Sequence, residues 1–159
     1  SSQARSLFDT LNSSGRNFVI IAPYNDPGSD DIFSVIDTLP KDRFRVLPSM
    51  RFAHFSELMK NASAIIGNSS VGVREAPFIG LPSLDIGSRQ TNRAKSSSVF
   101  FADAAEVNKI NIFLSTQWGR NFDRDDGFGG GSAARRFVDV ICNEDFWAGS
   151  LQKTFHDAN

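Results

Sequence analysis

One stretch of the sequence, residues 62–93, restricts the possible folds more than any other part of the chain. It begins with the apolar run 64–66, turns through Gly67 and three small polar residues, and continues into a segment, 71–79, that can form a helix. A second strand candidate, 82–86, and a polar loop, 87–93, follow Gly80. Strand, turn, helix, strand and loop in about thirty residues is the length of one βαβ unit. The stretch therefore predicts two parallel strands joined by a helix.

The same alternation extends along the rest of the chain. Residues 18–22 are all apolar and mostly β-branched or aromatic, as in a strand buried on both faces. Further strands are expected at 43–47 and 99–101, and helices over 4–11, 30–39, 52–59, 104–117 (capped by Asp103), 132–142 and after Asn143. The pattern predicts an α/β fold, a three-layer α/β/α sandwich with a doubly wound, mainly parallel sheet of four or five strands. The length of 159 residues suits one domain.

Composition excludes several classes of protein. The formal net charge of −1 argues against a nucleic-acid or membrane-surface binder, because such proteins carry a basic stripe. No apolar run approaches a membrane span and no signal peptide is visible, so we expect a cytoplasmic protein. Cys142 is the single cysteine, so we expect a buried thiol and no internal disulfide. The two histidines, His54 and His156, are far apart, and we expect no metal site.

The turn after the first apolar run has the features of an anion site. Gly67 allows a sharp bend, and Asn68, Ser69 and Ser70 are favoured residue types at the start of a helix. The first amides of a helix lack intrahelical acceptors and lie at the positive end of its dipole, so they bind phosphate readily. The two serine hydroxyls could add hydrogen bonds. An ordinary capped turn between strand and helix would have the same residues.

Three charged residues flank this turn. Glu75 lies about one helical turn into the predicted helix, near the strand ends where open α/β sheets bind ligands, and its carboxylate could accept hydrogen bonds from two ribose hydroxyls. Arg89 and Arg93 follow the next strand at the same edge, and a guanidinium fits a phosphate or carboxylate. Each of these side chains alone could be a solvated surface charge. Together with the turn they predict a site for a nucleotide diphosphate.

These residues also carry a family resemblance. The hydrolysing UDP-N-acetylglucosamine 2-epimerases have a motif similar to Gly67-Asn68-Ser69-Ser70-x-Gly72-x-Arg74-Glu75, Gly80-x-Pro82 and Gly87-x-Arg89-Gln90-x-x-Arg93. The resemblance extends from about residue 18 to 137 and is dense only between Gly67 and Arg93. The non-hydrolysing epimerases have a different turn, closer to Asp-Ser-Gly-Gly with paired glutamates, so the hydrolysing branch resembles this chain more closely.

The resemblance implies a fold and a reaction. It implies that residues 1–159 form one UDP-binding lobe of a two-lobed glycosyltransferase-B fold, and that the partner lobe is absent because the chain, which opens without methionine, is a segment of a longer protein. The whole enzyme would convert UDP-N-acetylglucosamine and water to N-acetylmannosamine and UDP, for sialic-acid synthesis, without a cofactor. The catalytic acid and base are expected on the missing lobe, so this fragment alone would be inactive. The parent protein is expected to be a homo-oligomer that binds UDP or a UDP-sugar.

The resemblance also implies residue roles. Ser69, Ser70 and Arg89 would hold the diphosphate, Arg89 would stabilise the leaving group, and Glu75 would hold the ribose while Arg93 adds positive charge. Asn25 matches an asparagine that reaches the nucleotide in the family, although it could be an ordinary turn residue. The loop containing Met50, Arg51 and Phe52 would frame the uracil, and Gly129-x-Gly131-x-Ala133 is similar to the family's Gly-Asp-Gly-Asn-Ala turn, with Gly130 and Ser132 as departures.

Two other functions remain open on the sequence. The chain could be the equivalent lobe of a hydrolysing epimerase for a UDP-diacetamido sugar, or of a glycosyltransferase, although Glu75 lacks the second glutamate that such transferases usually have. A different class, a non-catalytic nucleotide-binding module, would have the same turn and charges. An upstream lobe with its own acidic pair in the parent protein would favour the two enzymes, and its absence would favour the module.

Overall fold

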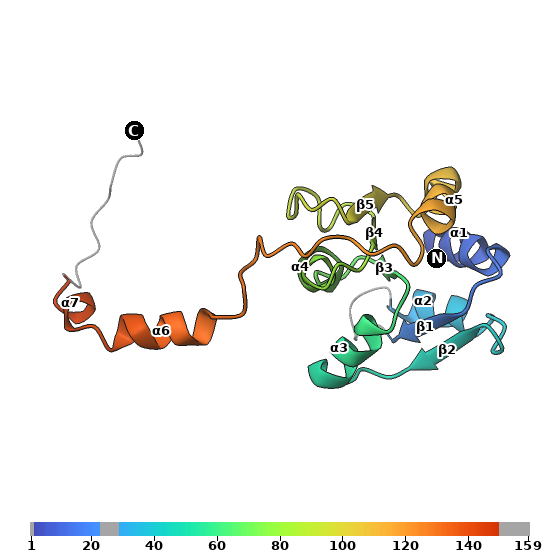
Figure 1. Ribbon diagram of the computed structural model, residues 1–159. Helices are drawn as coiled ribbons and strands as arrows, with labels where there is room; N and C mark the ends of the chain where they lie inside the picture. Colours follow the sequence, from blue (N-terminus) through green and yellow to red (C-terminus); the bar gives the residue numbers. More distant parts are fainter. Residues whose placement is uncertain (1, 23–28, 150–159) are drawn as a thin grey trace. The chain divides into compact units, whose positions relative to one another are not determined.

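The computed structural model describes residues 2–22 and 29–149, and Asn25, Leu151 and His156 lie outside this part of the chain (Figure 1). The chain divides into two compact units, Ser1–Asp125 and Asp126–Asn159, and each is described by itself. The expectation of a single domain over residues 1–159 stays a prediction.

Five parallel strands form the centre of the first unit. β1 (Phe18–Ile21) pairs with β2 (Phe44–Leu47), and β4 (Ser83–Ile86) lies between β3 (Ile65–Gly67) and β5 (Val99–Ala102). All three strand pairs are parallel, and in the second sheet Gly67 is opposite Asp85, which is opposite Phe101. The strands thus fall into a two-stranded and a three-stranded sheet, and the predicted α/β fold with parallel strands is confirmed.

The helices of this unit begin and end close to the predicted residues. They are α1 (Ser2–Ser13), α2 (Ser29–Ile36), α3 (Phe52–Lys60), α4 (Val71–Phe78) and α5 (Val107–Thr116). Two differences reach three residues: α2 ends at Ile36 instead of residue 39, and α5 begins at Val107 instead of residue 104 and does not use Asp103 as its cap. Instead, the Asp103 amide donates to the Glu106 carboxylate at 2.9 Å, and the Glu106 amide donates to the Asp103 carbonyl at 2.9 Å. Residues 103–106 therefore close a separate turn before the helix.

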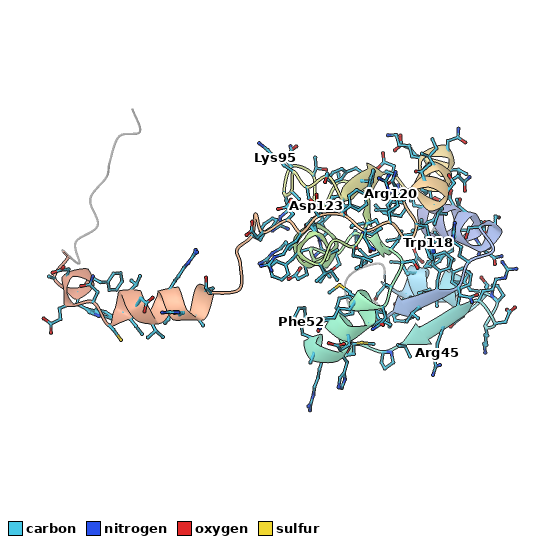
Figure 2. The ribbon with its side chains drawn as sticks, in the orientation of Figure 1. Arg45, Phe52, Lys95, Trp118, Arg120 and Asp123 are labelled. Atoms are coloured by element: carbon cyan, nitrogen blue, oxygen red, sulfur yellow. The ribbon has the colours of Figure 1, made fainter. Side chains whose placement is uncertain are left out.

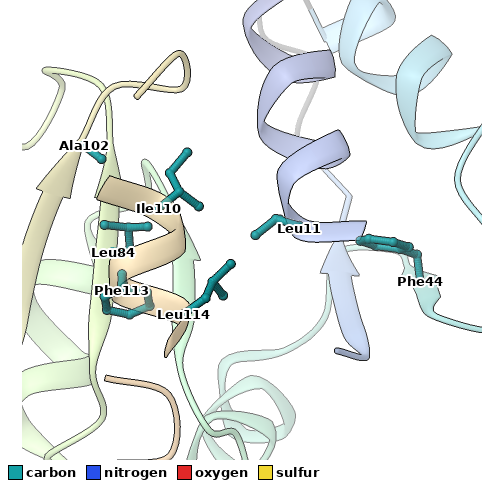
Figure 3. Packing of buried hydrophobic residues seen from close by; sticks show 7 residues of the cluster. All are labelled: Leu11, Phe44, Leu84, Ala102, Ile110, Phe113 and Leu114. Atoms are coloured by element: carbon teal, nitrogen blue, oxygen red, sulfur yellow. The ribbon is translucent and has the colours of Figure 1, made fainter. Parts of the chain in front are cut away.

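Two hydrophobic clusters lie on opposite faces of the three-stranded sheet. On one face, Leu84 and Ala102 pack with Ile110 and Phe113 of α5, and Leu11 of α1 extends the cluster toward β2 (Figure 3). On the other face, side chains of α3, α4, β3 and the turn before β4 pack together: Met59, Ala76, Leu81, Phe55, Ile65 and Val71. Neighbouring residues of β3 separate between the faces, because Ile65 joins one cluster and Ile66 the other. Helices cover both faces, as in the predicted three-layer arrangement.

Over its described residues, 126–149, the second unit contains two short helices, α6 (Ala133–Ile141) and α7 (Glu144–Trp147). The predicted cap of the last helix is confirmed, because the Asn143 side chain accepts a hydrogen bond from the Asp145 amide at 2.9 Å. The predicted burial of Cys142 is wrong, since its side chain is exposed and neither helix contains a buried residue. Within the described residues of both units, no helix is long and apolar enough to cross a membrane.

Candidate functional site

The turn between β3 and α4 has the backbone geometry that the sequence predicts. Gly67 has a φ of 154°, a region that favours glycine, and an added Cβ would have open space around it. One turn later, an ideal Cβ on Gly72 would lie 2.7 Å from the Ser83 hydroxyl oxygen, so only a glycine lets α4 approach the start of β4 this closely. Gly67 and Gly72 thus each have a local structural reason to be glycine.

Capping of α4 differs from the expectation. Ser70 is the cap residue by position, but its side chain makes no capping hydrogen bond, and the Ser69 hydroxyl accepts only a long contact of 3.4 Å from the Val71 amide. Ser69 is exposed and Ser70 is half-buried. The two hydroxyls are therefore not strongly engaged in holding the helix, which leaves them available to a ligand.

The donors that could meet an anion lie slightly before the helix. The amides of Gly72, Val73 and Arg74 donate to the Ser69 and Ser70 carbonyls at 3.0–3.2 Å. The amides of Ser69 and Ser70 have no hydrogen-bond partner among residues 2–22 and 29–149. An anion at this turn would therefore meet the amides of the two serines, where the sequence had predicted the first amides of the helix.

The loop after β4 is tied directly to this turn. The Gln90 side chain, only 1% exposed, donates through Nε2 to the Asn68 carbonyl at 2.9 Å. Its Oε1 accepts a hydrogen bond from Arg93 Nη1 at 3.0 Å. The structure thus brings Arg93 and the turn of Asn68, Ser69 and Ser70 (the serine turn) to one edge of the sheet, although they come from different loops. Arg89 is exposed and has no ion-pair or hydrogen-bond partner in the part of the chain that the structure describes.

Two carboxylates have buried oxygens without a hydrogen-bond partner among the described residues. Glu75 of α4 is half-buried and its Oε2 is unpaired, which fits a side chain that accepts hydrogen bonds from a ligand. Asp85 is 1% exposed, both of its oxygens are unpaired, and burial raises its pKa. Asp85 lies two residues after Ser83 and so shares the sheet face that α4 covers.

Sequence reasoning assigned no role to Gln90 or Asp85. For Asp85 a signal existed, because a carboxylate between Leu84 and Ile86 in a predicted buried strand is unusual. For Gln90 the signal was its place in the family motif, while its burial results from the fold and could not be read from a polar loop. Asn25, which the sequence assigned to the nucleotide, lies outside the described residues.

The loop expected to frame the uracil and the two cavities give little further information about the ligand site. Phe52 begins α3 and is 60% exposed. Lys95, which lines the cavity described next, lies on the loop before β5 (Figure 2). A cavity of about 250 Å³ is lined by part of the loop after β4 and by Phe101. A larger one of about 580 Å³, lined by residues of α1 and α5, contains none of the predicted site residues. The hydrogen bonds around the serine turn therefore define the site better than either cavity.

Comparison with known proteins identifies related sequences. Residues 1–142 match the family profile described as UDP-N-acetylglucosamine 2-epimerase. The chain is 38% identical over 159 residues to the UDP-N-acetylglucosamine 2-epimerase of Neisseria meningitidis serogroup B, covering 98% of this chain and 42% of that protein. It is 34% identical over 84 residues to polysialic acid biosynthesis protein P7 of Escherichia coli, covering 52% of this chain and 22% of that protein.

A further relative has a different named substrate. The chain is 26% identical over 102 residues to the UDP-N,N'-diacetylbacillosamine 2-epimerase (hydrolyzing) of Legionella pneumophila, covering 64% of this chain and 27% of that protein. In each of these three alignments the chain spans less than half of the relative's length.

Proposed function

Because this chain belongs to the UDP-N-acetylglucosamine 2-epimerase family, we propose that it is the UDP-binding part of a hydrolysing enzyme that converts UDP-N-acetylglucosamine and water to N-acetylmannosamine and UDP. The observation that carries this proposal is the linkage of two loops through Gln90, which sets Arg93 beside a turn with two unpaired amides. A diphosphate has the charge and the acceptor oxygens that such a group of donors requires.

The parts of the site would divide the ligand between them. The amides and hydroxyls of Ser69 and Ser70 would bind phosphate oxygens, and the exposed guanidinium of Arg89 would add a charge-assisted hydrogen bond. Glu75 has a buried oxygen that is free to accept a hydrogen bond from a ribose hydroxyl. Negative charge grows on the UDP leaving group as the bond from the sugar C1 to its oxygen breaks. Donors already fixed in place stabilise that charge without reorganising, which is the contribution we assign to this part of the enzyme.

The hydrolysing branch is supported by the turn Gly67-Asn68-Ser69-Ser70, which resembles that branch and lacks the paired glutamates of the non-hydrolysing enzymes. The two branches differ in their products, because only hydrolysis separates the sugar from UDP. Incubating the full-length protein with UDP-N-acetylglucosamine and following the products by phosphorus and proton NMR would distinguish them. Free UDP with N-acetylmannosamine would support the proposal. A UDP-sugar epimerised at C2 with the diphosphate retained would refute the hydrolysing assignment.

The binding roles have their own test. We expect calorimetric titration of the full-length protein to show binding of UDP and no binding of ADP. Arg89→Ala and Glu75→Ala should each weaken UDP binding by about tenfold to a hundredfold, the loss expected for one hydrogen bond to a charged group. Arg5→Ala, at an exposed residue of α1, and Glu57→Ala, at an exposed residue of α3, are charge-matched controls and should bind UDP normally. Failure of the unsubstituted protein to bind UDP would refute the site.

A second substrate is supported by one observation, the similarity to a relative named for UDP-N,N'-diacetylbacillosamine. This substrate would present the same UDP group to the same turn and loop, so UDP titration does not separate the two proposals. Comparing kcat/KM for the mono-acetamido and diacetamido UDP-sugars in the full-length protein would separate them, since the better substrate identifies the sugar.

A further inference from the structure

Gln90 combines deep burial with two hydrogen bonds to groups at the edge of the sheet. Its side chain is 1% exposed, yet it is flanked in sequence by the exposed Arg89 and Thr91. Its amide nitrogen donates to the Asn68 carbonyl, 22 residues earlier, and its amide oxygen accepts from the Arg93 guanidinium. A buried amide is normally hydrogen-bonded, and here its two bonds join the turn after β3 to a cation in the loop after β4.

The chemical type of this residue matters as much as its position. Arg93 is exposed, and an unrestrained arginine side chain samples many rotamers. The Gln90 oxygen restrains it through a charge-assisted hydrogen bond from a cation to a neutral acceptor. A glutamate in the same place would restrain it as well but would neutralise its charge. The amide therefore holds the arginine while leaving its positive charge available to a second anion.

The other end of Gln90 fixes the turn. Asn68 immediately precedes Ser69 and Ser70, whose amides have no partner within the described part of the chain. Anchoring the Asn68 carbonyl limits rotation of the backbone just before those amides. One side chain thus restrains both a cation and a pair of amide donors that come from different loops.

We infer that Gln90 is a positioning residue for phosphate, aligning the Arg93 guanidinium and the Ser69–Ser70 amides on the same anionic group. This inference rests on the proposed UDP site. Gln90 would not itself contact UDP, because its amide is buried and already bonded at both ends. Its effect should therefore be confined to the phosphates and should act through Arg93. A residue that only fills space would affect all ligands alike.

The test uses ligands that differ in their number of phosphates and variants that lack hydrogen bonds of the Gln90 side chain. The full-length protein is titrated with UDP, UMP and uridine, first unsubstituted and then as Gln90→Met, which keeps the length of the side chain and removes both hydrogen bonds. We expect Gln90→Met to raise the Kd for UDP by about tenfold or more, the usual scale for one lost charge-assisted bond, and to leave the Kd for uridine unchanged. An equal loss for UDP and uridine would overturn the inference.

A double-mutant cycle with Arg93→Ala tests whether Gln90 affects UDP affinity through Arg93. If Gln90 acts through Arg93, Gln90→Met should cost clearly less UDP affinity in the Arg93→Ala background than in the unsubstituted protein. Fully additive losses would show that the two residues act independently and would overturn the inference.

A second variant covers the case in which Gln90→Met does not fold. Gln90→Glu differs by one atom, keeps an acceptor for Arg93, and places an oxygen against the Asn68 carbonyl in place of a donor. We expect it to weaken UDP binding by at least tenfold with uridine binding unchanged, and normal UDP binding would overturn the inference. If the unsubstituted protein does not bind UDP, the proposed function is refuted, and this inference loses its basis. UDP binding that is unchanged from the unsubstituted protein in both Gln90 variants would refute the positioning role alone.

Discussion

Gly80, in the turn between α4 and β4, offers a stability test with a matched control in the same chain. Its φ is 71°, in the left-handed region, and a Cβ added to it would lie against the carbonyl oxygen of Phe122 at a distance that real Cβ atoms do not reach. That carbonyl belongs to a residue whose amide donates back to the Gly80 carbonyl at 3.0 Å, so it is not free to withdraw. Gly80→Ala should therefore cost both backbone strain and a steric clash.

Gly119 separates the two costs. Its φ is 74°, nearly the same as that of Gly80, but a Cβ there would have nothing within 4 Å. An alanine in the left-handed region costs about 1–2 kcal/mol, and overpacking against a neighbouring group adds about 1–3 kcal/mol. The free energy of unfolding should thus fall by about 1–2 kcal/mol in Gly119→Ala and by about 2–5 kcal/mol in Gly80→Ala. Replacing glycine by alanine also lowers the entropy of the unfolded chain. This gain in stability is common to both variants and cancels when they are compared with each other.

Urea unfolding followed by circular dichroism measures both values, with the midpoint and the slope reported separately. A lower midpoint with an unchanged slope would show lost stability and no change in the surface exposed on unfolding. Equal losses in the two variants would refute the reasoning, because they would mean that Gly80 and Phe122 do not approach each other in the folded protein.

Three further predictions concern charge and exposure. Burial raises the pKa of Asp85, so the folded protein binds this proton more tightly than the unfolded chain, and stability should fall as pH rises from the ordinary carboxyl range through the raised pKa. Asp85→Asn should remove that slope, at about 1.4 kcal/mol for each pH unit of elevation, and unfolding curves of both proteins that stay parallel across pH would contradict this. UDP affinity should fall severalfold between about 50 mM and about 500 mM sodium chloride, because Arg89 and Arg93 are exposed, and a salt-independent Kd measured by calorimetry would argue against their role. The exposed Cys142 thiol should react with Ellman's reagent without denaturant, and a reaction only after unfolding would show that α6 is covered.

The fold was predictable where apolar runs and turn residues alternate. In residues 62–93 the expected strands and helix match β3, α4 and β4 within one or two residues, because Gly67 and Gly80 mark turns on either side of the helix. The start of α5 was less predictable, since Asp103 and Glu106 are both acceptable near a helix start and the choice depends on which side chain takes the free amide.

The sequence indicates which residues could bind a ligand at this site, but it does not indicate the hydrogen bonds that position those residues. Ser69, Arg89 and Arg93 belong to residue types that bind phosphate, so the sequence identifies them, and their roles stay predictions. The sequence does not show that Gln90 is buried, because a polar residue in a polar loop becomes buried only when β4 and β3 pair and bring their loops together. Asp85 is a similar case, in which the strand assignment follows from its apolar neighbours and the unpaired carboxylate emerges only when α4 packs over it.

The contact between α1 and α5 has a consequence for synthesis of the protein on the ribosome. The two helices lie side by side, and the Arg16 side chain donates to the Leu114 carbonyl, 98 residues later, at 2.9 Å (Figure 1). Among the described elements of the first unit, α1 is translated before the strands, and α5, which packs against α1 beside Leu11, is the last helix to be made. The nascent chain therefore lacks part of the cover of α1 until α5 leaves the exit tunnel, and non-local contacts of this kind also slow folding. We expect chaperones that bind exposed apolar segments to associate with nascent chains that end before α5, and to leave once α5 has emerged.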